Sequence, residues 1–130
     1  MSETTTRYLI DPHRDFIEAE GIPIVEDFGL DLLTVEVGKW PRLGALGAYA
    51  MVKGRGDFLD TYVLELPPGT ETEPQRHLFE EVVYVLDGSG STSVETPEGT
   101  RSFEWGTKSL FALPLNARYR HFNASGSRPA

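Results

Sequence analysis

The sequence predicts an all-β domain, a small antiparallel sandwich or barrel with one short helix at its amino-terminal end. From residue 30 onward, short runs rich in Val, Leu, Tyr and Phe recur about every ten residues. Gly or Pro bounds each run, as tight turns between short strands require. This spacing favours antiparallel strands joined by turns over alternating β and α units.

The amino-terminal segment carries the signals of a short helix. Asp11 is a capping residue placed directly before Pro12, which suits the first helical turn. The helix is expected over roughly residues 12 to 20, because Gly21 and Pro23 then end it. Its few apolar residues cannot stabilise it alone, so we expect it to lie against a sheet. We assign residues 1–29 to an arm with this helix and residues 30–130 to the β-barrel.

The predicted strands follow one another with little intervening sequence. The extended runs are residues 30–37, 48–52, 62–66, 81–86, 91–96, 101–105 and 109–113. In the fourth run, Glu81, Val83 and Val85 are expected to face the interior. Val82, Tyr84 and Leu86 then face outward, and three large apolar side chains require cover from a second sheet, the segment 22–33 or a partner.

Composition restricts the function classes. The chain has 130 residues, enough for one domain, and its twelve Lys and Arg against twenty Asp and Glu give a formal net charge of −8. This charge repels phosphate backbones, so no nucleic-acid partner is predicted. No apolar run is long enough to span a membrane and the first residues do not form a signal peptide, so we predict no membrane partner and a cytoplasmic location.

The absence of cysteine directs attention to histidine and carboxylates. With no Cys and three His, disulfides, thiolate zinc sites and cysteine nucleophiles are all excluded. In an unbroken strand, His77 and Glu81 lie on one face together with Gln75 and Phe79. An imidazole and a carboxylate that converge on one point suit a divalent metal ion. A later segment places a second set on one face: Tyr119, His121 and Asn123.

The spacing of these residues resembles the cupins, a family of small β-barrels with two sequence motifs. Gly69 to Gly88 reproduces the first motif, in which Gly, five residues, His-x-His, three residues, Glu and six residues precede a second Gly, except that Gln75 replaces the first His. The second motif matches from Pro114 onward, with Asn116 in place of Gly and Tyr119 in place of His. The resemblance covers about residues 58 to 123 and implies a jelly-roll cupin barrel.

The resemblance also implies a metal site in which two ligands have changed. His77 and Glu81 stand at ligand positions, Gln75 is a weak replacement, and His121 restores a third strong ligand if it points inward. Tyr119, Asn123 and Phe79 would line the pocket. The metal, if any, is a weakly held divalent ion such as Fe, Mn, Zn or Ni. The alternative is a buried, metal-free polar cluster in which each group satisfies the next.

Two function classes remain open. The phrases from Arg76 to Leu86 and from Pro114 to Asn123 are similar to the amino-terminal domain of bacterial two-cupin proteins related to gentisate dioxygenase. The resemblance implies a small-ligand-binding or structural half of such a protein. The alternative is a metal-dependent cupin oxygenase or lyase acting on a small carboxylate; no catalytic residue is assigned.

The resemblance also bears on assembly. A cupin barrel normally has another strand after its second motif, whereas the sequence ends seven residues after Asn123. We therefore expect the barrel to lack its last strand, leaving a sheet edge exposed or filled by a neighbour's strand. The expected partners are a small-molecule ligand and either a second copy in a homodimer or a second cupin domain.

Overall fold

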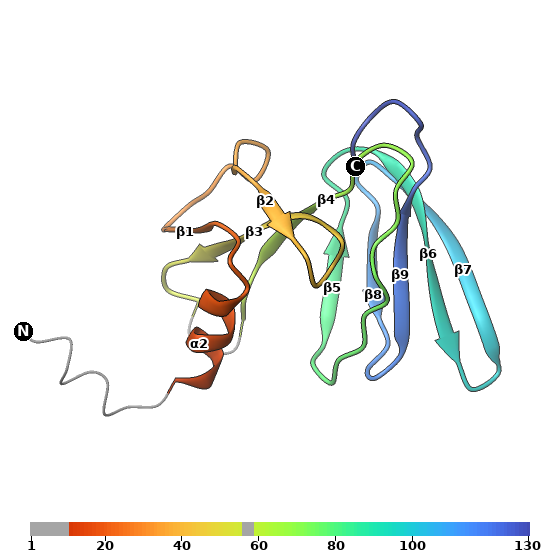
Figure 1. Ribbon diagram of the computed structural model, residues 1–130, viewed down its shortest axis with the longest axis horizontal. Coiled ribbons are helices and arrows are strands. Elements are labelled where there is room, and N and C mark those ends of the chain that lie inside the picture. Colours follow the sequence, from red (N-terminus) through yellow and green to blue (C-terminus); the bar gives the residue numbers. More distant parts are fainter. Residues whose placement is uncertain (1–10, 56–58) are drawn as a thin grey trace, which may run out of the picture.

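A computed structural model describes residues 11–55 and 59–130, and it confirms a small all-β fold with one short helix. Strands from the amino-terminal half form one sheet, and strands from the carboxy-terminal half form two more (Figure 1). The elements are α2 Pro12–Ala19, β1 Ile24–Asp27, β2 Gly38–Trp40, β3 Ala45–Val52, β4 Tyr62–Glu65, β5 Glu81–Tyr84, β6 Ser89–Thr96, β7 Gly99–Gly106, β8 Leu110–Leu113 and β9 Arg118–Asn123. No helix of these described residues is long and apolar enough to cross a membrane.

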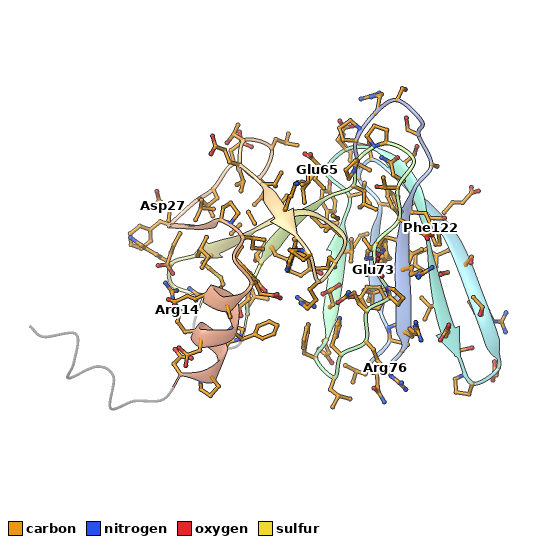
Figure 2. All side chains as sticks on the ribbon, in the orientation of Figure 1. Arg14, Asp27, Glu65, Glu73, Arg76 and Phe122 are labelled. Carbon is orange, nitrogen blue, oxygen red and sulfur yellow. The ribbon has the colours of Figure 1, made fainter. Side chains whose placement is uncertain are left out.

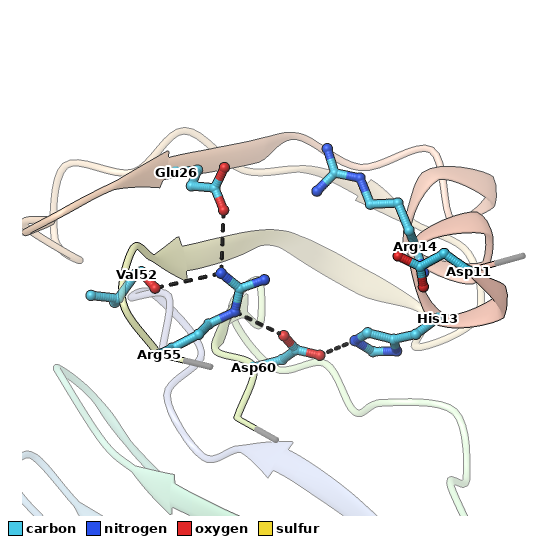
Figure 3. A network of polar contacts seen from close by, with 7 residues as sticks. All are labelled: Asp11, His13, Arg14, Glu26, Val52, Arg55 and Asp60. Atoms are coloured by element: carbon cyan, nitrogen blue, oxygen red, sulfur yellow. Dashed lines mark hydrogen bonds and ion pairs between the residues drawn. The ribbon is translucent and has the colours of Figure 1, made fainter. Parts of the chain in front are cut away.

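The predicted helix is confirmed, together with its cap. The Asp11 side chain accepts a hydrogen bond from the Arg14 backbone N–H, and Ile17 is buried against the first sheet. His13 of the helix pairs with Asp60, which also accepts from Arg55, and Arg55 reaches Glu26 of β1 (Figure 3). This surface network connects the helix to β1, to the segment before β4 and to the turn after β3.

The first sheet is built around β3. Strand β1 pairs parallel with the second half of β3, and β2 pairs antiparallel with the first half of β3 on the same side. Strand β4 pairs antiparallel with β3 on the other side. Residues 24–27, assigned to the arm, thus contribute a strand to this sheet. The strand expected over 30–37 is wrong, since the regular strand begins only at Gly38. Asp31 explains the difference, because its side chain and carbonyl accept from the backbone of Leu33 and Thr34 and form a turn.

The second half of the chain forms the two faces of a sandwich. Strand β6 pairs with β7 on one side and β9 on the other. Isolated bridges from Glu71 to Phe122 and from Gln75 to Tyr119 extend this layer beyond β9. Strands β5 and β8 form a separate antiparallel pair. Their side chains pack against the layer of β6, β7 and β9 in one cluster: Val83, Val94, Phe111, Leu113 and Tyr119. A second cluster lies under the first sheet, around Trp40, Tyr49 and Met51.

The orientation expected for the side chains of β5 is confirmed, but the segment expected to pack over its outer face is not found. Val83 packs in the core cluster and Val85 is buried. Val82 and Tyr84 face outward and are 67% and 53% exposed, while Leu86 is half-buried. Within residues 11–55 and 59–130, nothing covers Val82 and Tyr84, so the outer face of β5 is an exposed apolar surface.

A close approach in the first sheet gives a test of this packing. A methyl group on Gly47 would lie 2.3 Å from Cε3 of Trp40 and 2.9 Å from the Val63 carbonyl oxygen, and Trp40 is only 1% exposed. We expect Gly47→Ala to lower the free energy of unfolding by about 2 kcal/mol or more, because the ring cannot withdraw. Gly29→Ala is the control, since a methyl group there meets no atom within 4 Å. Equal urea midpoints for the two variants would contradict this packing.

Candidate functional site

The strongest polar cluster surrounds the carboxylate of Glu81. The hydroxyl of Tyr62 donates to Oε1 at 2.7 Å, and the hydroxyl of Tyr119 lies 3.3 Å from Oε2. Nε2 of His77 lies 3.0 Å from the Tyr119 hydroxyl and 3.6 Å from Oε1 of Glu81. The side chains of His77 and Glu81 are 11% and 9% exposed. The structure therefore brings the two predicted ligands His77 and Glu81 together, beside two phenols.

Separate elements supply the members of this cluster. Tyr62 begins β4 and Glu81 begins β5, whereas Tyr119 lies near the start of β9. His77 precedes a bend, and its carbonyl accepts from the Asn116 backbone N–H at 2.8 Å. The hydrogen-bonded cluster thus joins the first sheet to both faces of the sandwich, which are otherwise held in separate sheets.

The orientation of the His77 ring is fixed from both sides. Its Nδ1 lies 2.9 Å from the Phe79 carbonyl oxygen, which can only accept, so Nδ1 carries a proton. In the neutral ring, Nε2 then accepts from the Tyr119 hydroxyl. The ring also stacks on Phe79, with centroids 3.8 Å apart and planes at 2°. Both ring nitrogens are therefore engaged by groups of the protein itself.

Phe79 does not lie where an unbroken strand would place it. The chain bends at residues 78 and 79, and Phe79 is 62% exposed rather than turned into the interior with Glu81. The expected continuous face from Gln75 to Val85 is interrupted at this bend. Phe79 covers one face of the His77 ring instead of lining an enclosed pocket.

Both phenols of the cluster resist ionisation. Burial raises the pKa of Tyr62 well above its usual value, and the neighbouring Glu81 carboxylate raises it further. The pKa of Tyr119 is raised for the same two reasons, burial first and Glu81 second. At neutral pH both residues are hydrogen-bond donors, so neither is a phenolate that could bind a metal ion.

Gln75 is buried but serves another contact. Its Oε1 accepts from the Arg42 guanidinium at 2.8 Å, and its Nε2 donates to the Arg42 carbonyl at 2.8 Å. The residue is 8% exposed, and its amide thus ties the segment before His77 to the turn after β2. The carbonyl oxygen that could have been a weak metal ligand is already the acceptor for a cation.

His121 points inward but belongs to a different group of side chains. Its Nδ1 lies 2.7 Å from the Thr92 hydroxyl, which also accepts from Nε1 of Trp105 at 2.9 Å. The Thr92 hydroxyl proton then has His121 as its acceptor, so Nδ1 of His121 accepts this hydrogen bond. Burial lowers the pKa of His121 from 6.5 to about 4. His121 is therefore a neutral core residue and does not join His77 and Glu81.

Asn123, the remaining predicted residue of the pocket, organises the backbone. Its Nδ2 donates to the carbonyls of Leu66, Pro67 and Arg128, and its Oδ1 accepts from the Ser125 backbone N–H. These bonds attach the last residues of the chain to the end of β4. Asn123 is buried for this structural reason and takes no part in the Glu81 cluster.

The groups present do not fit a divalent metal ion. Among residues 11–55 and 59–130, no three His, Asp or Glu side chains lie close enough to hold one. His77 and Glu81 supply two potential ligands, whereas a protein zinc site ordinarily has at least three. The other candidate donors are occupied or protonated: Gln75, Tyr119 and His121. What the arrangement provides is a polar cluster in which the Tyr119 hydroxyl lies between a buried imidazole and a buried carboxylate.

The sequence analysis does not identify two residues that contribute side-chain contacts to this site, Tyr62 and Arg42. Tyr62 lies in an apolar strand pattern, and the only signal is that a phenol shares a face with Leu64 and Leu66. Arg42 lies in a turn, far along the chain from Gln75, and no spacing rule connects the two residues. Both contacts arise from the way β4 and the turn after β2 pack against the second half.

Comparison with known proteins gives matches of structure only. No protein-family model matches the sequence, and no curated protein matches it either. The cupin domain of Cnp3 from Schizosaccharomyces pombe is similar with a TM-score of 0.60 and 19% identity, over 76% of this chain and 66% of that chain. An oxalate decarboxylase from Lactobacillus farciminis, solved as a formate complex, gives a TM-score of 0.62 and 16% identity, over 77% of this chain and 30% of that one.

The chain has a cupin fold. A cupin domain from Bordetella pertussis also matches, at 24% identity and a TM-score of 0.48, over 66% of this chain and 85% of that chain. This chain spans about two thirds of the Cnp3 domain and less than a third of the oxalate decarboxylase. The similarity to the Cnp3 domain and to the oxalate decarboxylase confirms the cupin fold predicted from the motif spacing, while these distant similarities carry no residue roles.

The buried His121 gives a test based on pH. The unfolded chain binds a proton at His121 near pH 6.5, whereas the folded chain binds it only near pH 4, because its pKa is lowered by burial. His121 therefore favours folding fully above pH 6.5, and this contribution is lost as the pH falls to 4. The loss is about 3 kcal/mol at 1.36 kcal/mol per pKa unit.

The measurement is urea unfolding of the wild type and His121→Gln at several values between pH 7 and pH 4. Glutamine has no titrating group, so the variant should show a shallower decline in stability through this range. Carboxylates titrate in both proteins and cancel in the difference. Parallel curves for the two proteins would show that His121 is not a buried neutral imidazole.

Proposed function

We propose that this chain is a non-catalytic cupin domain that serves as the structural half of a larger two-cupin assembly. The observation that supports it is the internal use of every candidate ligand group. Glu81 accepts from one phenol and contacts a second, both nitrogens of His77 have protein partners, and Gln75 is bonded to Arg42. A catalytic metal site needs an open coordination position, and this cluster offers protein hydrogen bonds in its place.

The cluster suits a structural role for an energetic reason. A buried carboxylate that accepts hydrogen bonds stabilises the fold, because each bond to a charged group contributes about 1.5–3 kcal/mol. A buried carboxylate without partners would destabilise it instead. Tyr62, Glu81 and Tyr119 come from three strands in different sheets, so their bonds act as a cross-link inside the domain.

The two-cupin assignment is the finer part of the proposal. The likeness of the motif phrases to gentisate dioxygenase-like proteins supports it, as does the exposed apolar face of β5, which needs a partner. The catalytic function would then belong to the other cupin domain. Binding of a small ligand beside His77 is compatible with this structural role. The cytoplasmic location stays a prediction.

The second candidate function is a metal-dependent oxygenase or lyase that acts on a small carboxylate. One observation favours it: Nε2 of His77 and Oε1 of Glu81 lie only 3.6 Å apart and could turn toward one ion. The similar oxalate decarboxylase, solved with formate, is an enzyme of this kind. The change would require His77 to release Tyr119 and a third ligand to be recruited.

Metal analysis separates the two candidates. We expect the purified, untagged protein to contain no stoichiometric iron or manganese, and at most loosely held zinc or nickel, because the ligand set lacks a third strong donor. The measurement is elemental analysis after dialysis against a weak chelator. About one metal ion per chain, lost in His77→Ala, would favour the oxygenase or lyase instead.

The same variant tests the role of the cluster in stability. His77→Ala should lower the free energy of unfolding by about 1–3 kcal/mol, because it leaves Glu81 and Tyr119 with fewer partners. His13→Ala is the matched control, since His13 pairs with Asp60 at the surface, where its side chain is 60% exposed. The control should change stability by less than about 1 kcal/mol. A loss at His77 no larger than at His13 would contradict the structural role.

A further inference from the structure

A groove with a volume of about 300 Å³ follows the outer face of β9 beside β6 (Figure 1). Side chains alternate along a strand, and the buried Tyr119 and His121 face the core. The outward face of β9 therefore bears Arg118, Arg120 and Phe122, which all line the groove. The groove thus lies on the other side of β9 from the polar cluster that the Tyr119 hydroxyl joins.

Neighbouring segments form the two sides of this groove. On one side lies β6, where Ser93 is the register partner of Arg120. On the other side, the segment 71–75 bridges β9 at both of its ends but has one residue more between the bridges than β9 has. This bulge includes Pro74, which lines the groove and has no backbone N–H. An apolar residue therefore lies across β9 from a hydroxyl group.

Among the described residues that line the groove, one cation and one anion have no side-chain partner. Arg120 is paired with Glu71, whose Oε1 lies 3.5 Å from Nη1 of Arg120. Glu95 lies opposite Arg118 in the register of β6 and β9, where opposite charges ordinarily stabilise the sheet. Within residues 11–55 and 59–130, however, these two side chains form no ion pair or hydrogen bond, with each other or with another residue. Both charges therefore line the groove uncompensated.

We infer that this groove binds a small dipolar ligand, an α-amino acid with an apolar side chain. The ligand carboxylate would accept hydrogen bonds from the Arg118 guanidinium, which presents paired donors to such a group. The ligand ammonium would donate to the Glu95 carboxylate. The apolar side chain would lie along β9 against Phe122 and Pro74. A volume of about 300 Å³ is at the small end of ligand sites, which suits a ligand of this size.

Ligands with a single kind of charge fit the groove less well. A phosphate or a dicarboxylate would meet the carboxylates of Glu95 and Glu71 as well as Arg118, in a chain with a net charge of −8. A cation would meet both arginines. A ligand that carries both charges pairs with Arg118 and with Glu95, so neither group is covered and left unpaired. The inference does not depend on the proposed structural role, because the groove is separate from the Glu81 cluster.

An NMR titration of the isotope-labelled protein with L-phenylalanine tests the groove. Saturable shifts are expected at the backbone amides of Ser93, Glu95, Arg118 and Arg120, with a dissociation constant of about 1 mM. N-acetyl-L-phenylalanine lacks the ammonium group, and L-phenylalaninamide lacks the carboxylate. Each derivative should bind about ten-fold more weakly, or less, because it loses one charge-assisted contact.

Two variants assign the two ends of the ligand. Glu95→Gln should remove the preference for L-phenylalanine over its N-acetyl derivative, and Arg118→Gln should remove the preference over the amide. The matched controls are Glu104→Gln and Arg101→Gln on β7, which change the net charge equally but lie outside the groove. Both controls should keep both preferences. A substitution that acted only on stability would weaken all three ligands alike.

Four results would contradict the inference. The first is the absence of saturable shifts at the groove amides, and the second is equal affinity for L-phenylalanine and both derivatives. The third is tighter binding of inorganic phosphate than of L-phenylalanine, which would mean that the groove recognises anions alone. The fourth is a set of shifts centred on His77 and Glu81, which would place the ligand at the inner cluster instead.

Discussion

The fold depends on how a buried carboxylate is satisfied where three sheets meet. Glu81 stands at the start of β5, and its oxygens face phenols from β4 and β9. These phenols stay protonated because burial and the carboxylate itself raise the pKa of each. Tyr62 donates to this carboxylate and Tyr119 contacts it, so groups of the protein itself surround Glu81. Figure 2 draws the side chains on the ribbon and labels Glu73 and Arg76 on the segment that leads from β4 to β5.

The two halves of the chain otherwise have separate cores. One cluster packs around Trp40 under the first sheet, and the other lies between the two faces of the sandwich. The contacts between the halves are largely polar, from Tyr62 to Glu81 and from Arg42 to Gln75. Polar contacts fix geometry closely but bury little apolar surface.

Sequence spacing predicted most of the fold and part of the site. The motif frame placed His77 beside Glu81 correctly, because their positions depend on one local segment. It could not place Phe79, since a bend interrupts the alternation, or the strand over 30–37, where Asp31 forms a turn. Gln75 and His121 were expected near Glu81 from the same frame, yet Arg42 and Thr92 hold them elsewhere. Partners that are distant in sequence decided these outcomes, and no pattern within one segment reports them.

A double-mutant cycle between Tyr62 and Glu81 tests the central claim most directly. The free energy of unfolding would be measured for the wild type, Tyr62→Phe, Glu81→Gln and the double variant at neutral pH. If the phenol and the carboxylate hold the halves together, their coupling energy should be about 1–3 kcal/mol. Additive effects, with a coupling energy near zero, would contradict the account and show that Glu81 is held by something other than the hydrogen bond from β4.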